Sequence, residues 1–99
     1  MDSISESQER WVLKGELVTR EVGGQVFILM PDSTMHILEN ASAVFLFTHL
    51  DCDRDKGASI AELSEALVLN FQVSRDRAGQ DVSDFVRDLT GLGILTARA

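Results

Sequence analysis

The residues with the most obvious chemical potential form an acidic segment in the middle of the chain, DCDRDKGASIAE at 51–62. Asp51, Asp53 and Asp55 alternate along it, and Glu62 stands at its last position. A calcium loop of the EF-hand type takes oxygen ligands at its first, third, fifth and last positions. The segment is therefore a candidate divalent-cation site.

Two features of this segment disagree with a calcium loop. The sharp bend of such a loop needs glycine at its sixth position, but Lys56 stands there and Gly57 comes one residue late. Shifting the register to suit Gly57 places Cys52, Arg54 and Lys56 at ligand positions. The chain also offers no second loop of this kind, although EF-hands usually occur in pairs.

A helix cap explains the end of the same segment. Ser59-Ile60-Ala61-Glu62 matches the capping box S-x-x-E, directly before an apolar helical run. In a capping box, Glu62 turns back to the backbone amide of Ser59 and not toward a cation. We therefore interpret residues 51–58 as a solvated loop, and calcium binding through Asp51–Glu62 stays as an alternative.

The other reactive side chains do not form a catalytic pattern. His49 and Cys52 lack a group to orient them, and two soft ligands are too few for a structural zinc site. The sequence contains no glycine-rich phosphate loop and no nucleophile elbow. We expect a protein that is not an enzyme and that has no metal or cofactor.

Length and charge restrict the classes of partner. The chain has 99 residues and a net charge of -7, with a pI of about 4.6, so its surface should repel a phosphate backbone. A single cysteine, no signal-peptide pattern and no long apolar run favour a cytoplasmic protein without a membrane segment. We expect a poorly ordered tail over residues 1–10 and one domain over 11–99.

Three short strands come first. Residues 17–22, 25–30 and 34–38 have strand patterns, and Gly23-Gly24 and Pro31-Asp32-Ser33 between them are turn signals. The middle strand is apolar on both faces, because Val26 and Ile28 point one way while Phe27 and Leu29 point the other. Helices can cover one face; the segment around Trp11, a second copy in a homodimer, or a partner enzyme must cover the other.

Three helices follow. Asn40 is a suitable N-cap for a helix over 41–50, and Ser59 opens a second helix that runs to Phe71. Ser74 caps a third helix that reaches about Leu92, after which Gly93 suits a left-handed C-terminal cap. The element order is βββααα, which makes an α+β fold.

Several marks in this order resemble the PqqD-like family, named for the D component of pyrroloquinoline quinone biosynthesis. Leu38 and Asn40 stand at the entry to the first helix, and SIAEL opens the second. The ending Leu92-Gly93-Ile94-Leu95 matches as well, and the similarity covers roughly residues 17–95. The CDRDKGA insertion is longer than the Asp-Gly turn of many relatives, which indicates a stand-alone member of some other pathway.

The resemblance implies a small winged-helix-like domain that binds peptides without catalysing a reaction. Family members capture the leader segment of a ribosomally made precursor peptide and present it to a modifying enzyme, often a radical S-adenosylmethionine protein. The leader adds as a strand to the third strand and lies in a groove against the third helix, which is β-augmentation.

Carried onto this chain, the resemblance gives two walls for the groove. The strand wall would be Ser33, Thr34, Met35, His36, Ile37 and Leu38, and the helix wall would be Asp81, Val82, Asp84, Phe85 and Asp88. Asp81, Asp84 and Asp88 share one helix face. Either this acidic stripe favours a leader that carries Lys or Arg, or it is merely a solvated face.

A winged-helix DNA-binding regulator is the alternative function. It would need a basic recognition helix, whereas the third predicted helix has four acidic residues against three basic ones. Those residues are Arg75, Arg77 and Arg87 against Asp76, Asp81, Asp84 and Asp88.

Overall fold

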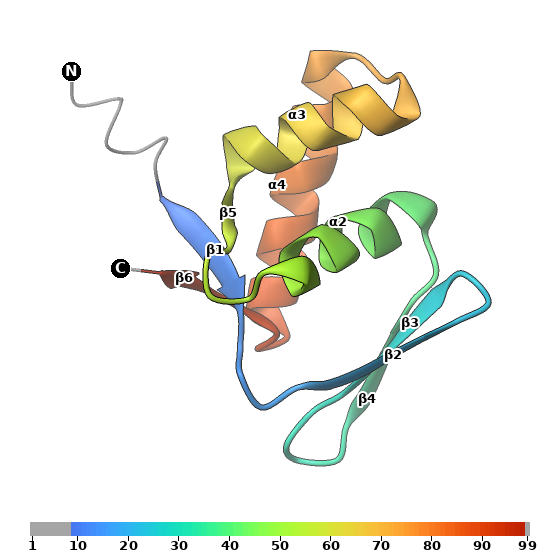
Figure 1. The fold of residues 1–99 in the computed structure, drawn as a ribbon, viewed down its shortest axis with the longest axis vertical. Helices are drawn as coiled ribbons and strands as arrows, with labels where there is room; N and C mark the ends of the chain where they lie inside the picture. Colours follow the sequence, from blue (N-terminus) through green and yellow to red (C-terminus); the bar gives the residue numbers. More distant parts are fainter. Residues whose placement is uncertain (1–8, 99) are drawn as a thin grey trace.

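The computed structural model describes residues 9–98, which form an α+β fold as expected. The elements are β1 (Arg10–Leu13), β2 (Val18–Val22), β3 (Gln25–Leu29), β4 (Met35–Leu38), α2 (Ala41–Cys52), β5 (Ala58–Ser59), α3 (Ile60–Phe71), α4 (Arg75–Gly91) and β6 (Leu95–Arg98). The helices pack on one another between two small sheets, with β2, β3 and β4 in one sheet and β1, β5 and β6 in the other (Figure 1).

The predicted meander is confirmed as the antiparallel sheet β2-β3-β4. Gly23 and Gly24 have φ of +59° and +81°, the positive values that a two-residue type I′ hairpin turn requires. At the second turn, the Asp32 carboxylate accepts a hydrogen bond from the Thr34 amide at 3.0 Å, and Ser33 has φ +73°. Residues Ser33 and Thr34 thus belong to this turn, and β4 starts one residue later than predicted.

The second sheet, in the order β5-β1-β6, is absent from the predicted βββααα order. Arg10 pairs with both Ser59 and Arg98, so the strand begins inside the segment expected as a tail. Residues 1–8 of that expected tail lie outside the described residues. These strands have between two and four residues, too few for a periodic pattern, and their partners are far away in sequence.

The three predicted helix starts are confirmed. Asn40 accepts hydrogen bonds from the amides of Ser42 and Ala43, and Ser59 and Ser74 each accept one from the amide three residues later. The end of α4 is a Schellman motif, because the Gly93 amide donates to Thr90 and the Ile94 amide donates to Leu89. Gly93 has φ +83° there, as expected for the left-handed cap.

The hydrophobic core lies between the helices and one face of β3. Val26 and Ile28 are 3% and 0% exposed, and they share one cluster with buried side chains of all three helices. Trp11 is partly buried against that cluster from β1. The Trp11 segment therefore does not cover the other face of the meander, where Val18 is 63% exposed.

Candidate functional site

A groove of about 480 Å³ opens where β4 ends and α2 begins. One wall is Leu38 with the first turns of α2, and the other is the exposed side of α4. The lining residues are Leu38, Asn40, Ser42, Ala43, Leu46, Arg77, Asp81, Asp84, Phe85, Asp88, Leu89 and Leu92. The Asn40 cap fixes the start of α2 beside Leu38, and so holds this wall in place.

The floor of the groove is apolar. Leu46, Phe85 and Leu89 are between 1% and 6% exposed, whereas Leu92 is 45% exposed at the end of α4. Leu89 and Leu92 were not among the predicted groove residues, although they follow Phe85 at helical spacing, the signal that could have placed them there. A floor of this kind suits apolar side chains of a bound segment.

Four of the five helix-wall residues predicted from the sequence line the groove, and the fifth does not. Asp81, Asp84, Phe85 and Asp88 all line the groove. Val82 is 0% exposed and belongs to the core, because its position on α4 is turned toward the other helices. Placing Val82 in the groove surface was therefore wrong.

Arginines of the same helix partly neutralise the acidic stripe. Arg77 contacts Asp81 at 3.3 Å, and Arg87 contacts Asp84 at 2.9 Å and Asp88 at 3.8 Å. These pairs are exposed, since both arginine side chains are at least 70% accessible, so each contributes at most about 1 kcal/mol to stability. The carboxylates can therefore exchange these partners at little cost.

Of the predicted strand wall, only Leu38 lines the groove, and the rest of β4 leads away from it as a free backbone edge. Among residues 9–98, β4 pairs only with β3, so its other edge has no strand beside it. The Thr34 carbonyl accepts from the Met30 amide at 2.8 Å, so Thr34 faces β3. Alternate residues of an antiparallel strand face opposite sides, hence His36 and Leu38 also face β3, and Met35 and Ile37 direct their N–H and C=O groups outward.

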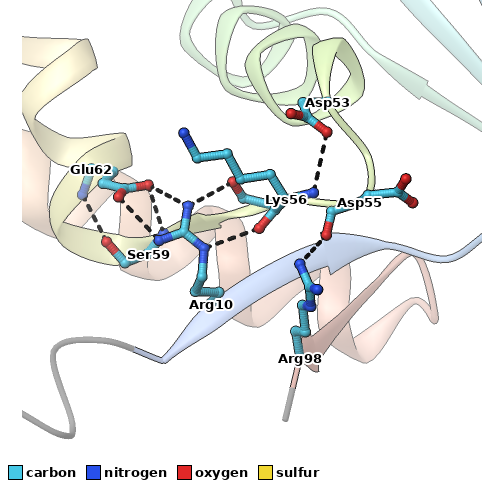
Figure 2. Close-up of polar contacts among 8 residues, drawn as sticks. Arg10, Asp53, Asp55, Lys56, Ser59, Glu62 and Arg98 are labelled. Carbon is cyan, nitrogen blue, oxygen red and sulfur yellow. Dashed lines mark hydrogen bonds and ion pairs between the residues drawn. The ribbon is translucent and has the colours of Figure 1, made fainter.

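The acidic segment that resembled a calcium loop is a clamped connection instead (Figure 2). The Ser59–Glu62 capping box is confirmed. Arg10 reaches across from β1 and donates to both carboxylate oxygens of Glu62, at 2.8 and 3.1 Å, and to the carbonyls of Lys56 and Gly57, both at 3.0 Å. The hydrogen bond from Arg10 lowers the pKa of Glu62 below its ordinary 4.5, and the Ser59 amide lowers it further.

The other carboxylates of this segment also have protein partners. Asp51 pairs with Arg54 at 2.7 Å, and the Asp53 carboxylate accepts from the Lys56 amide at 3.2 Å. Arg98 donates to the Asp55 carbonyl and so ties β6 to the same loop. Within residues 9–98, no three His, Cys, Asp or Glu side chains are grouped to hold a metal ion.

The three arginines of α4 bear on the DNA-binding alternative. Arg77 and Arg87 contact aspartates of the same helix, and Arg75 contacts Glu65 of α3 at 2.9 Å. A recognition helix needs arginines that are available to phosphates and bases. In α4 each arginine has a carboxylate beside it, and the helix carries four aspartates against three arginines, so it is not a basic helix.

The family model described as coenzyme PQQ synthesis protein D (PqqD) matches residues 25–95. The chain belongs to the PqqD family. No curated protein matches the sequence. Among the helices of residues 9–98, none is long and apolar enough to cross a membrane.

Two solved structures have the same fold. TbiB1, solved in complex with the TbiA(beta) leader peptide, is 21% identical with a TM-score of 0.75, covering 89% of this chain and 98% of that one. A lasso peptide synthetase B1 complexed with the leader peptide is 19% identical with a TM-score of 0.71, covering 88% of this chain and 98% of that one.

Proposed function

We propose that this chain is a non-enzymatic peptide-binding module, which captures the leader segment of a ribosomally made precursor peptide and presents it to a modifying enzyme. Membership of the PqqD family supports this function, as do the two leader-peptide complexes with the same fold. The observation that carries the proposal is the free edge of β4 beside an apolar groove. The exposed free thiol of Cys52 fits a reducing, cytoplasmic compartment.

The leader would bind by strand addition to β4. Its backbone would exchange hydrogen bonds with Met35 and Ile37, whose N–H and C=O groups point outward. Beyond Leu38, its side chains would enter the groove over Phe85 and Leu92. Backbone bonds would then supply affinity largely independent of sequence, and the groove would supply selectivity.

Hydrogen exchange followed by NMR tests this geometry with synthetic leader segments of precursor peptides encoded beside the gene of this chain. Without peptide, the amides of Met35 and Ile37 should exchange faster than those of His36 and Leu38. Peptide binding should slow Met35 and Ile37 and shift resonances of α4. Binding that leaves these two amides unchanged, or that shifts only residues 51–62, contradicts the proposal.

We further propose that the aspartates of α4 favour a leader carrying Lys or Arg near its apolar anchors. The support is the position of Asp84 and Asp88 on the groove rim and their weak exposed pairs with Arg87. Asp88→Lys should raise the Kd of such a leader roughly 1.5- to 5-fold and reduce the salt dependence of its binding. Asp76→Lys is the matched control, since Asp76 lies on the same helix outside the groove. Equal effects of the two variants would contradict this preference.

A further inference from the structure

The outer face of the β2-β3-β4 sheet, the face turned away from the helices, is apolar and uncovered among residues 9–98. Strand alternation and register place on it Val18, Arg20, Val22, Gln25, Phe27, Leu29, Met35 and Ile37. Val18, Val22 and Met35 are 63%, 53% and 53% exposed, and Ile37 is 46% exposed. Contiguous exposure of so many large apolar side chains is typical of an interaction surface.

The face is shaped to receive a protruding group. A hollow of about 390 Å³ lies over it, and its lining residues are Val18, Thr19, Arg20, Val22, Phe27, Leu29 and Met35. The groove proposed for the leader is lined by none of these residues. The two surfaces meet at β4, where the leader would use the backbone of Met35 and Ile37 and this face presents their side chains. The β2 side of the face, with Val18, Arg20 and Val22, lies apart from the leader site.

The positive charge of Arg20 indicates the kind of partner. Arg20 is the only charged residue that the three strands place on this face, and it has no carboxylate within ion-pair distance among residues 9–98. A guanidinium covered by an apolar partner needs a carboxylate opposite, because an unpaired buried charge is strongly unfavourable. The occupant must then combine apolar side chains with an Asp or Glu.

The same charge disfavours other occupants. A second copy packed face to face would bring a second Arg20 but no carboxylate from this face of its strands, because Glu21 of β2 lies on the other face, and each copy has a net charge of -7. Nucleic acid and anionic membrane are repelled by that net charge. A different protein is the occupant that the charge pattern favours.

We propose that the outer face of this sheet docks another protein through an apolar surface that carries an Asp or Glu side chain opposite Arg20. The inference goes beyond leader binding. Its test changes only Val18, Arg20 and Val22 of β2, the strand at the sheet edge opposite β4, so its failure can be distinguished from failure of the leader site.

Binding assays with purified proteins test this proposal. Each protein encoded by the genes flanking that of this chain is titrated against the full chain and two variants. Arg20→Glu should raise the Kd of one of these proteins by at least about 30-fold, as expected for reversing one member of a covered charge pair. Val18→Thr combined with Val22→Thr should raise it about 10-fold or more, while the β-branched side chains preserve the strand. Lys14→Glu, an equal charge change off the face, is the control and should leave the Kd unchanged.

Leader affinity and a melting curve are measured for each variant, and both should remain those of the original chain. An Asp or Glu reversed to Lys on the partner should restore binding to Arg20→Glu, which would identify the charge pair. The proposal is overturned if none of the flanking proteins binds at about 100 μM, if Arg20→Glu and Lys14→Glu act equally, if the chain dimerises through this face, or if anionic phospholipid vesicles occupy it. None of these results would alter the hydrogen-exchange test of leader binding.

Discussion

The two sheets of this small protein differ in how they contact the rest of the chain. The β5-β1-β6 sheet, here called the clamped sheet, is fixed by two of its own arginines. Arg10 joins β1 to the loop before α3, and Arg98 joins β6 to the same loop. Among residues 9–98, the β2-β3-β4 sheet keeps a free edge at β4 and an uncovered apolar face. Both sheets have three short strands, so size does not explain the difference.

This contrast separates residues that maintain the fold from residues available to partners. An unpaired strand edge and a bare apolar face promote aggregation, and proteins usually protect them. Here the arginine contacts hold the β5-β1-β6 sheet, and among residues 9–98 the β2-β3-β4 sheet has no such contact at β4 or on its outer face. Changes in the clamped sheet should therefore alter stability, and changes in the open sheet should alter binding.

The largest effect is expected for Gly57→Ala in the clamped loop. Gly57 has φ +66°, and a Cβ there would overlap the Trp11 carbonyl and the Val12 side chain. Backbone strain alone costs about 1–3 kcal/mol, and the overlap adds to it, so we expect a loss of about 3 kcal/mol or more in the free energy of unfolding. Urea denaturation of both proteins measures this difference in the free energy of unfolding. Gly15→Ala is the control, because a Cβ there meets nothing within 4 Å. Equal losses at the two positions would contradict the clamp.

Arg10→Ala should be the next largest change. It removes two charge-assisted bonds to Glu62 and leaves two loop carbonyls without their donor, at a cost of about 1–3 kcal/mol in unfolding free energy. Arg75→Ala breaks one exposed pair with Glu65 and should cost less than about 0.5 kcal/mol. Thermal melts that rank these two variants in the reverse order would refute the assigned role of Arg10.

Ile37→Pro tests the open sheet. Proline removes the outward N–H of Ile37, which β3 does not use, so the fold should tolerate it as an edge residue. Leader affinity should fall about 10-fold, or about 1.4 kcal/mol, in a calorimetric titration. Ile37→Thr keeps the N–H and should bind nearly as well as the original chain. If both variants bind alike, main-chain pairing at Ile37 is not used.

The smallest effect concerns pH. The pKa of Glu62 is lower in the folded chain than its ordinary 4.5, so the unfolded state binds more protons as pH falls through this range. The stabilisation by Glu62 is therefore complete above about pH 4.5 and is lost as the pH falls through the lower folded pKa. The melting temperatures of the original chain and Glu62→Gln should converge on acidification. A constant difference between pH 6 and the acid limit would show that Glu62 acts without its charge.

The sequence was informative wherever one short segment determines its own structure. The Gly23-Gly24 hairpin, the Asn40 cap and the Ser59–Glu62 capping box are local, and all three are confirmed. The β5-β1-β6 sheet could not be predicted from the sequence, because Arg10 pairs with residues that are distant in the chain.

The candidate site shows the same limit. Helical spacing places Asp84, Phe85 and Asp88 near one another, and they line the groove together. Spacing alone does not say that Val82 is covered by the other helices. Such facts depend on how separate elements pack.

The pairing of β1 with β6 has one further consequence. Arg10 and Arg98 are direct partners, so the described chain enters and leaves the fold at one place, on the side of the molecule away from β4 (Figure 1). Adjacent ends allow a domain to be inserted into a loop of another protein without disturbing either. Inserted into a surface loop of an unrelated enzyme, this domain would keep its β4 edge on the side away from the point of insertion.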